Sequence, residues 1–255
     1  MELSRQELFE FLESKYGQYN QPEFIESDPI SVPHRYTRKE DIEISAFLTA
    51  TISWGNRVSI VQDAEKLLRM MGESPFDFLL EARVDDFKRF SSFYHRTFNG
   101  TDCIFFLNSL KNIYQDQDGL EFLFIPDNDS GIKGSIRKFR SVFLETDHSE
   151  RSEKHIANPD KGASAKRLLM FLRWMVRHDE KGVDFGLWKS IPASILMCPL
   201  DVHSGTVARK LGILSRTQND WQAVEELTAV LRSFDPLDPI KYDFALFGLG
   251  VFEGL

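Results

Sequence analysis

Apolar residues recur along most of this chain at the spacing of α-helices, and strand-like alternation is scarce. Residues 41–53 are nearly all apolar after an acidic start, which predicts a buried helix. After a polar interruption at residues 54–57, a second helix is predicted to end at Gly72. Its apolar face consists of Val61, Ala64, Leu67, Leu68 and Met71.

Further helices are predicted in the rest of the chain. Their apolar faces consist of Phe106, Leu110, Ile113 and Tyr114, of Ile132, Ile136, Phe139 and Phe143, and of Trp221, Val224, Leu227 and Leu231. Thr101 is the expected cap of the first, and Asn219 or Asp220 the cap of the last. A polar loop at residues 145–164 precedes the strongest helix, at residues 163–178, and an Asp-Pro repeat precedes a final apolar helix. The predicted fold class is all-α.

Composition and length agree with a globular protein. The chain has 255 residues, 42% of them hydrophobic and 27% charged, which suits one large domain or two modest ones and argues against wholesale disorder. Its 22 Phe residues indicate a bulky helical core. No apolar stretch is long enough for a membrane span, and residues 1–17 are typical of an amphipathic helix rather than a signal peptide.

The cysteines and the charge narrow the function classes. Cys103 and Cys198 are too few for a disulfide framework, a four-cysteine zinc site or an iron–sulfur cluster, so the cytoplasm is the expected compartment and no cofactor is expected. The net charge of −8 argues against a general nucleic-acid coat. Residues 133–177, however, hold eleven Lys or Arg against five Asp or Glu, a local balance of +6 that allows a basic groove.

Lys166 is the first candidate for chemistry. It lies near the start of the strongest helix and shares one stripe of it with Arg173 and Arg177. A lysine at the border of an apolar face can lose solvation, which favours the free, nucleophilic amine. The spacing alone favours a simpler interpretation, a solvated basic face whose aliphatic stems cover the edge of the core.

Asp201 is the second candidate, because it stands just before a predicted helix. It can serve as the N-cap of that helix, as a carboxylate at the mouth of a cleft, or as both. His203 forms an Asp-x-His pair with it. No third ligand has a suitable spacing, so a supporting role is expected for His203 and no metal site is predicted.

Residues 53–57, SWGNR, interrupt two helices with an aromatic ring, an amide and a cation. Trp54, Asn56 and Arg57 suit stacking on a base and contact with phosphate. The alternative is a helix–helix turn in which Trp54 is a buried anchor and Gly55 provides the bend.

The order of these features resembles the helix-hairpin-helix DNA glycosylase superfamily. The string CPLDVHSGTVARKLGIL resembles the segment with that superfamily's catalytic aspartate, which falls on Asp201, with the histidine on His203. The string AKRLLMFLRWMV resembles the lysine-bearing helix of the archaeal 8-oxoguanine glycosylase branch, and its Schiff-base lysine falls on Lys166. The Gly-rich hairpin of these enzymes is not matched by residues 187–199, and their C-terminal cysteines are absent, so no iron–sulfur cluster is expected.

More narrowly, several strings over roughly residues 28–252 together resemble the family of uncharacterised bacterial proteins called DUF2400. These strings are SWGNR, FYHRTFNG, KRLLMFLRWMVR, PLDVHSG and DPIKYDFALFGLG.

The resemblance to the glycosylases implies two helical lobes flanking a cleft within one unit of residues 1–255. Lobe A would comprise about residues 1–40 and 130–255, and lobe B about residues 41–129. The implied function is excision of a flipped, damaged base from double-stranded DNA, with Lys166 and Asp201 catalytic and with Schiff-base lyase activity as an option. Trp54, Asn56, Arg57, Arg173 and Arg177 would contact the DNA. The alternative is a non-catalytic descendant that binds nucleic acid or a protein.

Overall fold

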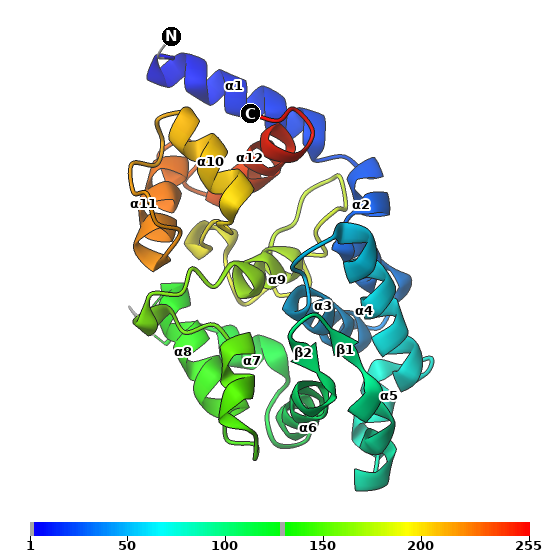
Figure 1. Cartoon of the computed structure of the whole chain (residues 1–255). Helices are drawn as coiled ribbons and strands as arrows, with labels where there is room; N and C mark the ends of the chain where they lie inside the picture. The colour runs from blue at the N-terminus through cyan, green and yellow to red at the C-terminus, as the bar shows by residue number, and fades with distance from the viewer. Residues whose placement is uncertain (1–2, 128–130) are drawn as a thin grey trace. The chain divides into compact units, whose positions relative to one another are not determined.

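The computed structural model of the chain describes residues 3–127 and 131–255 (Figure 1). Helices make up 65% of it and strands 2%. This content confirms the all-α class that the hydrophobic pattern predicted. No helix in the described ranges is both long enough and apolar enough to cross a membrane.

The α-helices are α1 (Arg5–Tyr19), α2 (Glu23–Ser27), α3 (Lys39–Thr51), α4 (Arg57–Met71), α5 (Pro75–Glu81), α6 (Gly100–Asp116), α7 (Leu120–Phe124), α8 (Gly131–Phe143), α9 (Lys166–Val176), α10 (Val202–Lys210), α11 (Trp221–Arg232) and α12 (Tyr242–Val251). The connections between the α-helices vary in length, and the longest runs from the end of α9 to the start of α10. Short 3-10 helices lie at Pro29–Ser31, Pro33–Arg35, Val84–Ser92, Glu150–His155, Pro159–Lys161, Ala193–Ile195 and Pro239–Lys241. Strands β1 (Tyr94–His95) and β2 (Phe98–Asn99) form a small antiparallel hairpin.

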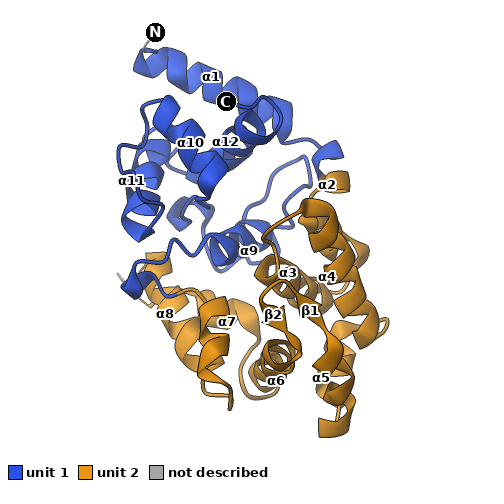
Figure 2. Cartoon of the chain, viewed as in Figure 1, with its two compact units in different colours: residues 1–24, 158–255 blue, residues 25–157 orange. Residues whose placement is uncertain are grey.

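The chain divides into two compact units, coloured separately in Figure 2. Unit 1 contains residues 1–24 and 158–255, and unit 2 contains residues 25–157. Unit 2 extends beyond the expected lobe B at both ends, because the Pro29–Ser31 segment packs on α3 and α8 packs on α7. The expected division near residue 130 falls at residues 128–130, outside the described residues.

Unit 2 has a core rich in phenylalanine. Phe47 of α3 lies at its centre, with ring centroids 6.0 Å from Phe106, 5.6 Å from Phe139 and 5.6 Å from Phe143. All four rings are buried. Every residue of α3 from Asp41 to Thr51 is also buried, which confirms the predicted buried helix.

Two local predictions in unit 2 need correction. On α4 the inward position is Ile60, whereas Val61 is half-buried, although the end of the helix at Gly72 is as predicted. The cap of α6 is Asn99 rather than Thr101, because the Asn99 side chain accepts hydrogen bonds from the backbone amides of Thr101 and Asp102.

Unit 1 is organised around α12, which packs along α1 and against α10 (Figure 1). Gly248 allows the close approach of α1, since a Cβ there would lie 2.1 Å from Cδ2 of Tyr19. Asp220 caps α11 and is thus the second of the two predicted alternatives. Helix α9 contributes an almost continuous buried face. It begins at Lys166, and α10 begins directly after Asp201, so a predicted site residue lies at the start of each helix.

Candidate functional site

Lys166 is the first residue of α9, in unit 1. The residue before it, Ala165, has a left-handed backbone with φ 53° and ψ 26°, which is costly for a residue with a Cβ. This conformation turns the chain from the preceding segment into the helix. The Lys166 side chain is 27% exposed, so it is neither fully solvated nor fully buried.

Asp201 is the N-cap of α10 and is held there by several bonds. Its Oδ1 accepts hydrogen bonds from the amides of His203, at 2.9 Å, and Ser204, at 3.0 Å. In return the Asp201 amide donates to Ser204 Oγ, and the Asp201 carbonyl oxygen accepts from Asn219 Nδ2 at 2.9 Å. The backbone and one carboxylate oxygen of Asp201 are therefore fixed by the helix start.

The structure brings Lys166 and Asp201 together. Oδ2 of Asp201, the oxygen that does not cap the helix, lies 3.4 Å from Nζ of Lys166. Burial alone would raise the pKa of Asp201, but the Lys166 charge and the hydrogen bonds from Ser204 outweigh it, so the pKa lies below its usual value. The carboxylate is consequently ionised at neutral pH beside a partly exposed amine.

A second carboxyl group belongs to the same cluster. Asp243, on α12, is buried and accepts a hydrogen bond from Nη1 of Arg173. Burial is the largest influence and raises the pKa of Asp243 to about 6, the charge of Arg173 opposes this rise, and the nearby charge of Asp201 adds to it. The environments of Asp201 and Asp243 thus push their pKa values apart.

Arg173 and Arg177 are placed differently from the prediction that they meet phosphates. Both side chains are buried, at 5% and 0% exposure. Their guanidinium groups pair with carboxylates of unit 1: Asp184 and Asp243 for Arg173, and Asp179, Asp184 and Asp238 for Arg177. Because these guanidinium groups are buried and paired with carboxylates inside the unit, they are not exposed for contact with phosphate.

His203 lies on the first turn of α10 and is exposed. The backbone amide of His203 donates a hydrogen bond to Asp201. The residue also packs closely on Gly250 of α12, since a Cβ added at Gly250 would lie 3.2 Å from the Cβ of His203. The residue therefore supports the Asp201 cap through its backbone. In the described part of the chain, no group of three or more His, Cys, Asp or Glu side chains is arranged to hold a metal ion.

Residues 53–57 form the connection between α3 and α4 in unit 2. Asn56 caps α4 by accepting a hydrogen bond from the Ser59 amide, and Gly55 has a φ of 106°, which favours glycine. A Cβ at Gly55 would lie 2.8 Å from Nη1 of Arg96, at the turn of the hairpin. The helix–helix turn that was the alternative for this segment is therefore present, and Gly55 makes the bend.

Trp54 is half-buried between two histidines. Its ring is stacked on His155, with centroids 5.8 Å apart, and meets His95 edge-on at 5.1 Å. His95 is in turn fixed by its hydrogen bond from Nε2 to the Trp54 carbonyl oxygen. Part of the Trp54 ring thus anchors the connection. Asn56 is exposed and Arg57 is half-buried, so both residues reach the surface of unit 2.

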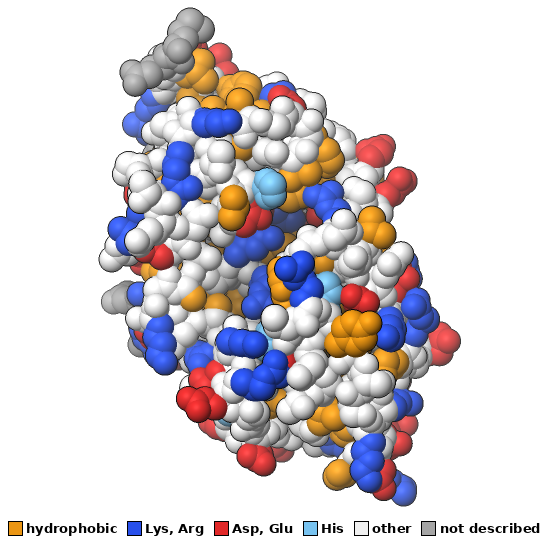
Figure 3. Space-filling view, viewed as in Figure 1, with side chains coloured by type: hydrophobic (Ala, Val, Ile, Leu, Met, Phe, Trp, Pro, Cys, Tyr) orange, Lys and Arg blue, Asp and Glu red, His pale blue; other side chains and the backbone are white. Residues whose placement is uncertain are grey.

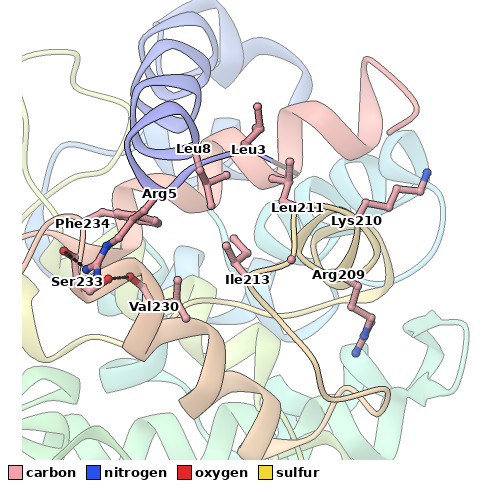
Figure 4. A pocket seen from close by; sticks show the side chains of 11 residues that line it. Leu3, Arg5, Leu8, Arg209, Lys210, Leu211, Ile213, Val230, Ser233 and Phe234 are labelled. Atoms are coloured by element: carbon pink, nitrogen blue, oxygen red, sulfur yellow. Dashed lines mark hydrogen bonds between the residues drawn. The ribbon is translucent and has the colours of Figure 1, made fainter. Parts of the chain in front are cut away.

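Basic side chains are visible on both units in the view of Figure 3. Although the net charge of the chain is −8, the face drawn there therefore carries cations. A cavity of about 750 Å³ in unit 1 is lined by Leu8, Ile213 and Phe234, with Arg5 bonded to the Ser233 carbonyl oxygen at its side (Figure 4). Lys166 and Asp201 do not line it. The candidate site therefore lies elsewhere in unit 1.

Sequence reasoning missed Asp243 and its link to Arg173. The signal for Asp243 was present, since it is a lone acidic residue in the otherwise apolar run of α12. The role of Asp184 had no such signal, because it lies in a short loop segment between Gly182 and Gly186. The residues 187–199, where a Gly-rich hairpin was sought, form a loop with one 3-10 turn, held by Arg232 through the carbonyl oxygens of Ser194 and Leu196.

Comparison with known proteins gives one match. No curated protein and no solved structure matches the chain. A family model, described as a protein of unknown function (DUF2400), matches residues 28–252. Since this match covers most of the sequence, including α3, the Lys166–Asp201 pair and all of α12, the chain belongs to the DUF2400 family.

Proposed function

We propose that this protein is a base-excision DNA glycosylase with Schiff-base lyase activity, and that Lys166 is its nucleophile. The observation that carries the proposal is the 3.4 Å distance between Nζ of Lys166 and Oδ2 of Asp201. These two residues, predicted from separate parts of the sequence, meet at the starts of two helices. A partly exposed amine beside a fixed carboxylate is the arrangement that amine-based excision needs.

In the proposed reaction the base is first turned out of the duplex stack. The neutral amine of Lys166 then donates its lone pair to C1′ of the sugar, and the bond from C1′ to the base nitrogen breaks with its electrons leaving on the base. The attached nitrogen, which now carries two protons and a positive charge, gives one proton to the departing base. The C1′–O4′ bond of the sugar ring then breaks with its electrons on O4′, which takes up a proton from solvent, and the nitrogen lone pair forms the C1′=N bond of a protonated Schiff base. Elimination of the 3′ phosphate from this intermediate nicks the strand.

Asp201 contributes electrostatic stabilisation. Positive charge develops on the sugar as the base departs, and a carboxylate that is already ionised and held in place lowers the energy of that state. The low pKa of Asp201 and its bonds to the start of α10 both suit this task, because the charge needs no reorganisation during the reaction. Asn56, Arg57 and the exposed part of Trp54 are proposed to contact the DNA.

The alternative is a non-catalytic protein of the same ancestry that binds nucleic acid or a protein partner. It is supported by the capping role of Asp201, since a cap and an ion pair with Lys166 account for this side chain without catalysis. The two candidates differ in one outcome, the release of a base.

The test is a panel of duplexes, each with one damaged base, assayed for both base release and strand nicking. We expect wild-type protein to release at least one lesion and Lys166→Ala to lose the release. Lys161→Ala removes an exposed lysine just before α9 and is the matched control, which should keep full activity. Salt-dependent binding of the duplexes without any base release would favour the non-catalytic alternative.

A further inference from the structure

The β1–β2 hairpin of unit 2 carries an arginine at a position that favours glycine (Figure 1). Its two strands are joined by Arg96 and Thr97, since His95 pairs directly with Phe98. Arg96 has a φ of 53°, whereas Thr97 does not have a positive φ. A positive φ at the first residue alone is the pattern of a type II′ turn, whose first position favours glycine because an L side chain is strained there.

The residues on both sides of Arg96 hold the turn in this conformation. The buried ring of His95 is hydrogen-bonded through Nδ1 to Oδ2 of Asp63, at 2.7 Å. On the other side, the carbonyl oxygen of Thr97 accepts a hydrogen bond from Nη2 of Arg151, at 3.0 Å. Strain at a residue persists only where the surrounding structure fixes it. The backbone position of Arg96 is therefore set by its neighbours.

The Arg96 side chain is exposed and lies against Gly55 in the connection between α3 and α4. A Cβ placed at Gly55 would be 2.8 Å from Nη1 and 3.0 Å from Cδ of Arg96, so the side chain fills the space that this glycine leaves open. Within residues 3–127 and 131–255, its guanidinium group forms no ion pair and no hydrogen bond. The nearby Arg151, in contrast, pairs with the buried carboxylate of Asp102 at 2.7 Å.

The strain at Arg96 supports a role in binding. A glycine would satisfy the turn without strain, and the described part of the fold gains no ion pair from the arginine in return. Strained positions that the fold maintains are concentrated at binding and active sites. A cation held at such a position, with its N–H groups facing solvent, points to an anionic ligand from outside the chain.

We propose that Arg96 binds a backbone phosphate of duplex DNA and that the hairpin holds its guanidinium group in place for this contact. The inference rests on the proposed function, which puts residues 53–57 at the DNA. Asn56 follows Gly55 directly and is exposed, and because its Oδ1 caps α4, its Nδ2 can donate to the same phosphate. A planar guanidinium group matches two phosphate oxygens, and one that already lies against the backbone loses little freedom on binding.

Arg96→Gly separates this binding role from a structural role. Glycine adopts a positive φ without strain, so we expect the midpoint of urea unfolding to equal or exceed that of wild type. The affinity for an undamaged duplex, measured by fluorescence anisotropy, should fall roughly tenfold at low salt. The slope of log affinity against log salt should fall by about 1, equally on duplexes of different sequence.

Two further variants control for the kind of side chain and for the loss of one positive charge. Arg96→Lys keeps a cation, so the salt slope should stay near that of wild type while the affinity falls, because the two-pronged contact is lost. Arg83 is also an exposed arginine of unit 2, at a φ of −91°. Arg83→Ala lowers the charge of the protein by the same amount as Arg96→Gly and should leave both slope and affinity unchanged.

Several results would overturn the inference. They are a wild-type protein that binds no duplex at low salt, an unchanged slope in Arg96→Gly, an equal loss of slope in Arg83→Ala, and an unfolding midpoint of Arg96→Gly well below that of wild type. The assay for base release tests the proposed function separately. If a base is released but Arg96→Gly binds like wild type, the proposed function stands without the inference. If binding depends on Arg96 but no base is released, the inference stands and the catalytic function fails.

Discussion

Nζ of Lys166 lies 3.4 Å from Oδ2 of Asp201, while Oδ1 of the same carboxylate accepts two hydrogen bonds from the first turn of α10. The two oxygens thus have separate partners. The start of α10 fixes the position of the carboxylate through Oδ1, and Lys166 faces Oδ2, which does not bond to the helix. The capping role and the proposed catalytic role of Asp201 are therefore compatible, and different substitutions can separate them.

Asp201→Asn keeps a good N-cap and removes the charge that faces Lys166. We expect the free energy of unfolding to change by less than about 1 kcal/mol, because Asn caps a helix about as well as Asp and a partly exposed ion pair contributes little. Asp201→Ala also removes the cap and should cost about 1 kcal/mol more. Urea unfolding of both variants measures the difference. Equal stabilities of the two would show that the cap contributes nothing.

The raised pKa of Asp243 makes stability depend on pH in a defined direction. Its folded value of about 6 lies above the unfolded value of about 3.9, so the folded state binds more protons between these values. Stability conferred by the protonated group is then lost as the pH rises through this window, by roughly 2–3 kcal/mol in total. In Asp243→Asn this loss is absent.

Urea unfolding of wild type and Asp243→Asn at a series of pH values tests this linkage. The stability of the variant relative to wild type should increase from about pH 4 to about pH 6 and then level off. The difference between the proteins is informative because the other titrating groups, Asp238 among them, are common to both. A difference that is the same at every pH would contradict the burial argument for Asp243.

Ala165 occupies a left-handed conformation directly before Lys166. Ala165→Gly relieves this strain, so we expect a change between neutral and a stabilisation of about 1 kcal/mol. Ala229→Gly, at an exposed position in the interior of α11, is the matched control and should cost about 1 kcal/mol. Thermal or urea unfolding compares the two. A loss at position 165 as large as that at 229 would mean that the conformation is not strained.

Arg57 is the cation that the proposed DNA contact uses at the start of α4. Arg57→Ala should weaken duplex binding and lower the slope of log affinity against log salt by about 1, as expected for one lost phosphate contact. Arg69 near the end of the same helix is exposed and paired with Glu65, so Arg69→Ala is the control and should leave the slope unchanged. Fluorescence anisotropy over a salt series gives both slopes. Identical slopes for the two variants would show that Arg57 makes no phosphate contact.

Much of the fold could be predicted because helices with one buried face leave a clear period in the sequence. The apolar faces of α8 and α11 were assigned correctly, as were the buried α3 and the end of α4 at Gly72. Caps were harder, because Asn99 and Thr101 are both suitable residue types and only the path of the chain from the hairpin selects Asn99.

The site could be predicted only in part, since spacing places residues on a helix face but does not say what packs there. Lys166 and Arg173 share a stripe of α9, yet the first is 27% exposed and the second is buried against Asp184 and Asp243. The carboxylates that pair with Arg173 come from a later loop and from the last helix. The position of these carboxylates beside Arg173 depends on tertiary packing, which a local sequence pattern does not predict.

The most direct test of the central claim is covalent trapping of Lys166 on a duplex with an abasic site, using borohydride and locating the adduct by peptide mapping. Lys166→Arg keeps a cation that can pair with Asp201 but cannot form a Schiff base, and Lys161→Arg is its control. We expect an adduct at Lys166 in wild type and in Lys161→Arg, and none in Lys166→Arg. A wild-type protein that forms no adduct, or an adduct that persists in Lys166→Arg, would contradict the claim that this lysine is the nucleophile.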